Sequence, residues 1–344
     1  MLRRRFFAAV TTLVLFAGVA DAAQFKIATV APEGSQWMTD LKDAAAQVKE
    51  RTDGRVTFKF YGGGVMGNDK KVLRKIRIGQ LHGGVFTANG LAERYRDIQL
   101  YGLPMVFGSQ EEVDYVRERM DPLLKAGLDD AGFVSFGFAG GGFAKLMGND
   151  SVTTIDQLRG RKVWVPEGDR ASYEAMATLE LSPVVLPITD VLTGLQTGLL
   201  EYIATPPVGA VVLQWFTKVK YVMQYPFAYT LAVMAIDKKH FVKLSDADQQ
   251  VVSQVFTAMY EDFEQQNRVD NEQAEEALRS NGLQFVDVDL GRMEAIQAKL
   301  AETSRRMAGE GAFSLDLLDQ MLEYVKAFRS EAGSEPAAAA AGAE

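Results

Sequence analysis

Apolar and polar positions alternate along residues 155–207 in a pattern that predicts two consecutive strand, turn and helix units. The first unit has a strand at 162–165, a Pro-Glu-Gly turn and a helix over about 169–179. The second has a strand at 183–186, a proline-bearing turn and a helix capped by Thr189 or Asp190. Ligands collect at the carboxyl ends of strands in such units, so we expect a binding site there.

The same alternation of strands and helices recurs on both sides of this stretch. It predicts an α/β protein with mixed sheets. Helices are expected at 36–52 and 110–130, and strands at 24–30, 55–61, 81–87, 134–138 and 227–236. The glycine-rich residues 62–69 lack the Lys and Ser/Thr of a phosphate-binding loop, and we interpret them as a plain connection.

One helix is expected to be unusually long. Ser245 is a capping residue with Asp246 and Asp248 in the first turn behind it, and neither Gly nor Pro interrupts the chain up to residue 280. At 1.5 Å per residue such a helix exceeds about 50 Å. A coiled coil is a poorer interpretation because apolar residues become sparse after Phe263.

The two ends of the chain differ from the rest in composition. Residues 1–22 have a basic head, an apolar run and an Ala20-Asp21-Ala22 cleavage site, which predicts a secretory signal peptide and a periplasmic protein. A membrane anchor is the alternative for that run. No other stretch has the roughly 20 apolar residues needed to span a bilayer, so we expect no membrane insertion of the mature chain. Residues 331–344 lack core-forming side chains, which predicts a disordered tail.

Charge and residue usage narrow the possible functions. A net charge of -8 argues against a nucleic-acid partner. The chain has no cysteine and only two isolated histidines, His82 and His240, so we expect no metal site, no cofactor and no catalytic residues. Glu167 and Asp169 form a carboxylate pair suited to acid-base work, but a solvated turn is the favoured interpretation. The sequence therefore predicts a protein that is not an enzyme.

Two motifs carry a resemblance to a known family. They read LRGRKVWVP at 158–166 and DVLTGLQTGLLEYIATP at 190–206. The chain resembles the DctP-like solute-binding proteins of tripartite ATP-independent periplasmic (TRAP) transporters over nearly its whole mature length. The resemblance implies a two-lobed periplasmic binding protein fold, with mixed sheets in each lobe and a long helix spanning both lobes.

The resemblance also implies how the chain is divided and what it works with. Lobe I comprises 23–139 and 227–250, lobe II comprises 140–226, and the long helix and C-terminal helices at 246–330 pack on both lobes. Such a protein closes on a small-molecule ligand by rotation near Gly140 and Phe227. It then delivers the ligand to the small and large permease subunits in the membrane.

The resemblance places atypical residues in the binding site. The position of the family arginine that binds the ligand carboxylate is occupied by Trp164, and that of a second basic contact by Ala144. The family asparagine corresponds to Thr205, and a polar residue after the first strand to Val30. An unpaired carboxylate is costly to bury, so we expect an uncharged or hydrophobic, aromatic ligand.

We expect the remaining wall of the pocket to be apolar, with few polar anchors. Thr205 and Gln196 are expected to orient the ligand, and Trp37 either lines the site or packs its helix. The other expected wall residues are Phe143, Ile188, Trp215 and Phe86.

Three alternatives stay open at this point. In the first, Trp164 fills the cavity completely. In the second, the protein binds lipid-like molecules and works with a partner other than a permease. In the third, Lys145 or Arg161 supplies the charge for an organic acid.

Overall fold

The computed structural model of the protein describes residues 22–332. The signal peptide expected at 1–22 lies outside the described residues except for Ala22, and so does the tail from 333 onward. The predicted start of the disordered tail is wrong by a short stretch, because Glu331 and Ala332 form the end of a helix.

One group of strands forms the sheet of the first lobe. The central strand β1 (Ala23–Ala28) pairs in parallel with both β2 (Val56–Tyr61) and β3 (Gly83–Thr87). On the other side of β3, the strand β10 (Ala228–Asp237) runs antiparallel. The sheet is therefore mixed, as the alternation of elements predicts. The strand expected at 134–138 is wrong in extent, because the strand in this region, β4, comprises only Phe133–Val134, which pair with β10.

The second lobe has its own mixed sheet, built around β5 (Ala139–Gly148). This strand runs antiparallel to its neighbours, whereas the strands of the central 155–207 stretch run parallel to one another. They are β6 (Lys162–Pro166), β7 (Ser182–Leu186) and β8 (Tyr202–Thr205), and the sheet is completed by β9 (Tyr221–Met223) and β11 (Gln284–Val286).

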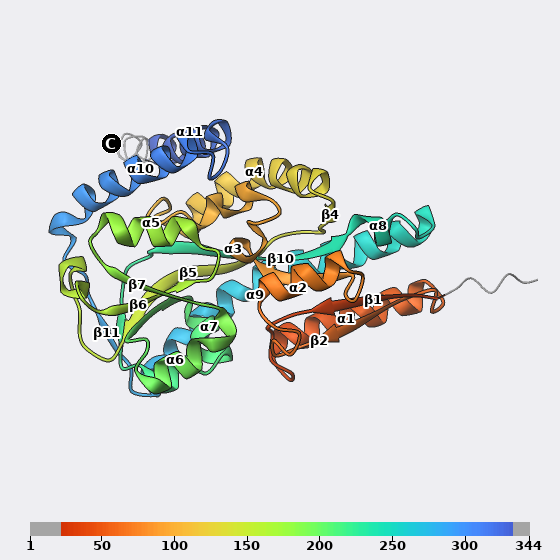
Figure 1. Ribbon diagram of the computed structural model, residues 1–344, viewed down its shortest axis with the longest axis horizontal. Coiled ribbons are helices and arrows are strands. Elements are labelled where there is room, and N and C mark those ends of the chain that lie inside the picture. The colour runs from red at the N-terminus through yellow and green to blue at the C-terminus, as the bar shows by residue number, and fades with distance from the viewer. Residues whose placement is uncertain (1–21, 333–344) are drawn as a thin grey trace, which may run out of the picture.

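The two sheets are joined through β5 and β10, which pair with each other in the middle of the molecule (Figure 1). Each of the two strands also belongs to one lobe, since β10 continues along β3 and β5 continues along β8. The register between them shifts at Thr230 and Leu231. The chain therefore crosses between lobes inside paired strands, close to the expected hinge positions Gly140 and Phe227.

Helices cover both sheets, and several start at the caps that the sequence contains. Ser35 accepts a hydrogen bond from the Met38 amide to start α1, and Ser245 accepts one from the Asp248 amide to start α9. The helices of the two lobes are α1 (Gln36–Arg51), α2 (Asp69–Arg77), α3 (Ala88–Leu91), α4 (Gln110–Asp130), α5 (Arg170–Thr178), α6 (Val191–Thr197), α7 (Pro207–Val212) and α8 (Lys238–Phe241).

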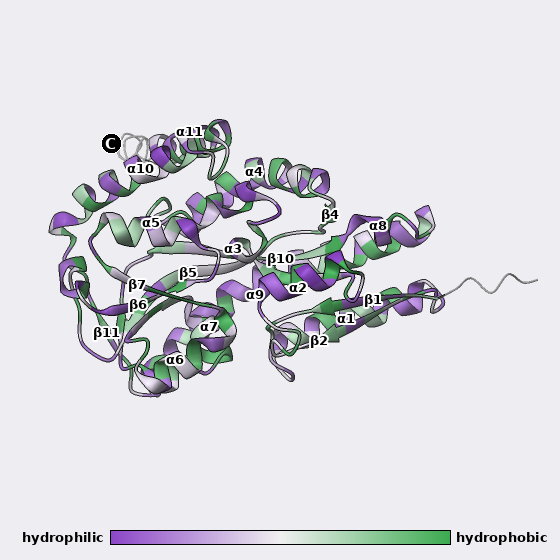
Figure 2. Cartoon of the chain, in the orientation of Figure 1, coloured by the Kyte–Doolittle hydropathy of each residue, from purple (hydrophilic) through white to green (hydrophobic). Residues whose placement is uncertain are grey.

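The longest helix, α9 (Asp246–Ser280), has 35 residues and contacts α1 in the first lobe and both α7 and β5 in the second. It is followed by α10 (Met293–Gly309), which packs on α5, and α11 (Leu315–Ala332), which packs on α4. Hydrophilic and hydrophobic residues interleave along these outer helices (Figure 2), as expected for helices with one buried face. Within residues 22–332, no helix combines the length and hydropathy that crossing a bilayer requires.

Candidate functional site

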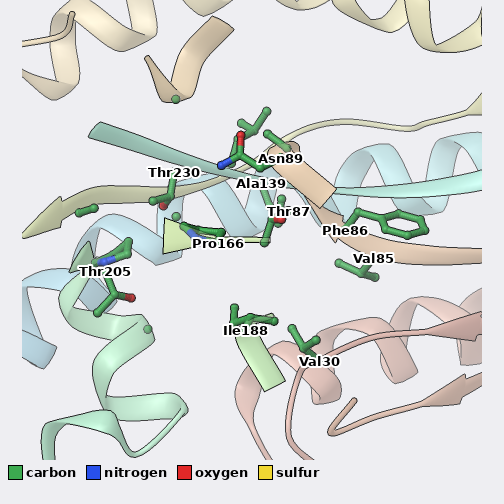
Figure 3. A pocket seen from close by; sticks show the side chains of 18 of the residues that line it. Val30, Val85, Phe86, Thr87, Asn89, Ala139, Pro166, Ile188, Thr205 and Thr230 are labelled. Carbon is green, nitrogen blue, oxygen red and sulfur yellow. The ribbon is translucent and has the colours of Figure 1, made fainter. Parts of the chain in front are cut away.

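A cavity of about 300 Å³ lies between the two lobes. Its wall includes residues at or just beyond the carboxyl ends of strands from both sheets: Val30 after β1, Thr87 on β3, Pro166 on β6 and Thr205 on β8 (Figure 3). Pro187, just after β7, also lines it. The site is therefore at the strand ends where the pattern of the central stretch places it.

Most of the residues expected at the site lie on this wall. Seven of the predicted contacts line the cavity: Val30, Phe86, Ala144, Trp164, Ile188, Thr205 and Trp215. Trp37, for which packing was the other interpretation, lines it too. These residues do not contribute equally to the wall. The ring of Phe86 points away from Pro166 and Thr205 (Figure 3) and belongs to the core of the first lobe.

Two of the expected contacts, Phe143 and Gln196, are not part of the wall of the cavity. Phe143 packs edge-on against the Tyr229 ring, with 5.5 Å between ring centroids. Gln196 is exposed on α6. Neighbouring residues of a strand face opposite sides, so Ala144 reaches the cavity while Phe143 points elsewhere.

Trp164 lies on the cavity wall without filling the space beside it. The side chain is buried, with 5% of its surface exposed. Its indole N–H donates to the Leu186 carbonyl at 2.9 Å, and the ring meets that of Trp215 at a centroid distance of 5.3 Å and an angle of 80°. The indole therefore offers the ligand an apolar surface, because its one donor is already used.

Among the described residues, no Lys, Arg or His side chain lines the cavity. The two cations considered for an organic acid are engaged elsewhere. Lys145 forms an ion pair with Glu275, and Arg161 forms ion pairs with Asp150 at 3.0 Å and Glu201 at 3.4 Å. Guanidinium and ammonium groups held by carboxylates outside the cavity supply no charge to a ligand within it.

Two hydrogen bonds across the cleft, which we call the cleft bonds, join the lobes. The side-chain amide of Asn68 donates to Glu167 at 2.5 Å, and that of Asn89 donates to Asp169 at 2.7 Å. All four residues also line the cavity. The first and second lobes are thus held together at the site itself, in a closed arrangement. Sequence reasoning missed these contacts, because each bond joins residues far apart in the chain.

Glycines allow the close approach of the lobes. Gly64 has a φ of +70°, and a Cβ there would stand 2.7 Å from the Thr189 side chain of the other lobe. Gly168 has a φ of +91°, with the Asn89 carbonyl oxygen 3.1 Å from the position of its missing Cβ. Both φ values disfavour other residues. The interpretation of residues 62–69 as a plain connection is therefore wrong, since this loop contacts the opposite lobe.

Asp169 also differs from its expected setting on a solvated turn, because its side chain is buried. It caps α5 by accepting the Ser172 amide at 2.9 Å. Burial raises the pKa of Asp169, and the hydrogen bonds from Ser172 oppose that rise. Asp169 therefore caps α5 and accepts one of the two cleft bonds. These two roles explain its buried carboxylate without acid-base chemistry.

Hydrogen bonds join β5, the strand that crosses between the lobes, to the long helix α9. Glu264 accepts the Gly140 amide at 3.0 Å, Asn267 donates to the Gly140 carbonyl, and Asn271 donates to the Gly141 carbonyl at 3.1 Å. Arg117 from α4 pairs with Glu264 at 2.8 Å. Motion of one lobe against the other at Gly140 is thus coupled to the position of α9.

We predict that Asn89→Ala opens the lobes. The change removes the amide donor from the buried Asp169 carboxylate, and losing a bond to a charged group costs about 1 to 3 kcal/mol. That corresponds to a shift of about 5-fold to 150-fold in the equilibrium toward the open form. Small-angle X-ray scattering of the variant should therefore give a larger radius of gyration.

A matched control for this test is Gln36→Ala, which removes an amide-to-carboxylate bond of 2.7 Å to Asp40 within α1. That bond does not join the lobes, so the radius should stay unchanged. An Asn89→Ala protein as compact as the wild type would show that the cleft bonds do not hold the closed form.

The fold and the cavity together define a two-lobed ligand-binding protein, and comparisons with known proteins agree. The family model of DctP, described as bacterial extracellular solute-binding protein family 7, matches residues 27–310. A solute-binding protein of Roseobacter denitrificans is 24% identical over 309 residues, which cover 87% of this chain and 94% of that protein.

Solved structures show the same fold at low sequence identity. The sugar acid binding protein DctPAm from Advenella mimigardefordensis, in complex with galactonate, superimposes with a TM-score of 0.82 at 18% identity, covering 89% of this chain and 98% of that one. A TRAP periplasmic solute binding protein from Desulfovibrio salexigens with bound orotic acid has a TM-score of 0.80 at 18% identity, covering 88% and 98%.

The chain belongs to the DctP family of bacterial extracellular solute-binding proteins. As a member of this family it is an extracellular solute-binding protein and not an enzyme. The predicted fold class, with a mixed sheet and two lobes, is confirmed.

Proposed function

We propose that this receptor captures a small uncharged or hydrophobic molecule in the periplasm and delivers it to the small and large subunits of a TRAP permease. The observation that carries the proposal is the composition of the cavity wall. Trp164 and Trp215 present apolar surface there, and no basic side chain of residues 22–332 lines it. A carboxylate ligand would be buried there without a counter-charge, which costs several kcal/mol.

Burial of apolar ligand surface supplies the affinity in this proposal. Removing about 200 Å² of apolar ligand surface from water, at about 25 cal/mol per Å², contributes roughly 5 kcal/mol before the costs of association. A cavity of about 300 Å³ suits a small molecule better than a long lipid chain. Thr205, buried on the wall at 5% exposure, is the polar side chain we assign to ligand orientation.

A ligand panel tests this function by thermal melting. Galactonate and orotate, which two of the similar solved proteins bind, and C4-dicarboxylates should leave the melting temperature unchanged at micromolar concentration. A ligand at one hundred times its Kd would add about 2.7 kcal/mol of stability, which is a shift of several degrees. Such a shift with any of these acids contradicts the proposal.

Mass spectrometry of small molecules released from the denatured protein is the complementary measurement. We expect a compound without a carboxylate. Pull-down of the periplasmic protein against membranes containing the permease subunits encoded in the same genome would test the delivery step, and no ligand-dependent association would argue against it.

A further inference from the structure

The charged side chains on the described wall of the cavity all have the same sign. Every charged side chain that lines the cavity within the described chain is acidic: Asp40, Asp69, Glu167 and Asp169. Three of these carboxylates have a short hydrogen bond from a neighbouring amide. Gln36 donates to Asp40 at 2.7 Å, and the two cleft bonds occupy Glu167 and Asp169. These three acids are accounted for by the protein itself.

Asp69, the first residue of α2, is the exception. Its carboxylate has one hydrogen bond, from the Thr87 hydroxyl at 3.4 Å, and it forms no ion pair with any described residue. Asp69 is half-buried, and it lines the cavity. A carboxylate can accept about four hydrogen bonds, so Asp69 retains unused acceptor capacity on the wall of the site.

A second unused acceptor lines the same cavity. Asn267 of α9 is 5% exposed, and its amide nitrogen donates to the Gly140 carbonyl. Its Oδ1 has no hydrogen-bond donor among the described residues. A buried acceptor without a donor is unfavourable, although this oxygen is itself shielded from the surface of the cavity. The described wall of the cavity thus carries carboxylates and no basic side chain, and its donors are neutral groups such as the Thr205 hydroxyl.

We propose that the ligand is an apolar molecule that carries a primary amine, which donates to the carboxylate of Asp69. This rests on the proposed function, from which it keeps an apolar ligand body without a carboxylate, and it replaces an uncharged head group by an ammonium group. A hydrogen bond between an ammonium group and a carboxylate is roughly twice as strong as a neutral one. The apolar body of the molecule occupies the remaining cavity, against wall residues such as Trp164 and Ile188.

Three probes with the same apolar body and different head groups test the proposal: 2-phenylethylamine, 2-phenylethanol and 3-phenylpropanoate. Isothermal titration calorimetry at neutral pH should give the tightest binding for the amine, about tenfold tighter than the alcohol. The carboxylate should bind weakest, since it meets only negative charge.

Variants assign the preference to one side chain. In Asp69→Asn the amine should lose its advantage over the alcohol, while alcohol binding is kept. Asp69→Glu should restore part of the advantage. Asp43→Asn makes the same charge change at an exposed position of α1 that is not part of the cavity wall, and the tenfold ratio should persist. Thermal melting of each variant verifies that it is folded.

The amine preference should also depend on pH. Burial raises the pKa of Asp69 to about 6, with a contribution from the Glu167 charge and an opposing one from the Thr87 hydrogen bond. Asp169, held by Asn89, lines the same cavity, and Lys70, the next residue of α2, lies 3.9 Å from Glu167. Asp69 is ionised above its pKa, so amine affinity should rise between about pH 5 and pH 7, and alcohol affinity should not.

Different binding results would overturn the amine assignment alone or the amine assignment together with the proposed function. Alcohol binding as tight as amine binding, or no binding of any probe at millimolar concentration, overturns the amine assignment and leaves an uncharged ligand in place. Tightest binding of 3-phenylpropanoate overturns both. An unchanged ratio in Asp69→Asn also overturns the assignment of the amine to Asp69.

Discussion

Replacing Trp164 by alanine should lower the free energy of unfolding by about 3 to 5 kcal/mol. The indole of Trp164, a residue of β6, is buried, packs against the Trp215 ring and donates to the Leu186 carbonyl. The change therefore leaves a cavity, removes an aromatic contact and removes one of the two donors to the Leu186 carbonyl, which keeps the Glu167 amide at 3.1 Å. Urea denaturation followed by circular dichroism measures the loss.

The same substitution should also weaken binding of apolar ligands, because it removes a wall of the site. Trp164→Phe keeps most of the ring packing and loses the N–H donor, so it should cost only about 1 kcal/mol. Trp37→Ala is the matched control, since Trp37 lines the same cavity but is only half-buried. A loss below about 1 kcal/mol for Trp164→Ala would contradict its assigned packing role.

Replacing Arg117 by methionine should cost about 3 to 5 kcal/mol, because it breaks a buried ionic network. The guanidinium pairs with Asp121 at 3.2 Å and Glu264 at 2.8 Å, and donates to the Phe138 carbonyl at 2.9 Å. Methionine fills a similar volume but leaves two carboxylates without their cation. Equilibrium denaturation in guanidinium chloride gives the change.

The Arg117 substitution should also affect lobe closure. Glu264, which Arg117 holds, accepts the Gly140 amide at the strand that crosses between the lobes. Arg268→Met is the control, because Arg268 pairs with Asp114 on the surface, where a salt bridge contributes about 1 kcal/mol or less. Equal losses of stability in Arg117→Met and Arg268→Met would show that the buried Arg117 network stabilises the protein no more than a surface ion pair does.

Elements governed by local interactions could be predicted closely from the sequence. The helix expected at 110–130 is α4, and the long helix after Ser245 ends at residue 280 as expected. Caps, helical periodicity and the absence of Gly or Pro act over a few residues, so they are visible in the chain itself. The strand at 134–138 failed because its pairing depends on β10, about a hundred residues away.

The candidate site could be predicted in part. The strand ends that line the cavity follow from the order of strands and helices, which is why Trp164, Thr205 and Ile188 lie on its wall. The direction of single side chains does not follow from that order. Gln196 turned outward on α6, and the loop at 62–69 reached the other lobe, because packing between distant segments decided both.

The sequence by itself determined the α/β order of the elements, the lack of cysteine and the presence of an aromatic residue at 164. Only the tertiary structure decided the electrostatics of the cavity. Lys145 and Arg161 are close in sequence to the site but are paired with carboxylates outside its wall, while Asp69, remote in sequence from Trp164, lines it. Charge in a buried site depends on which side chains the fold brings within a few ångströms, and sequence spacing does not contain that information.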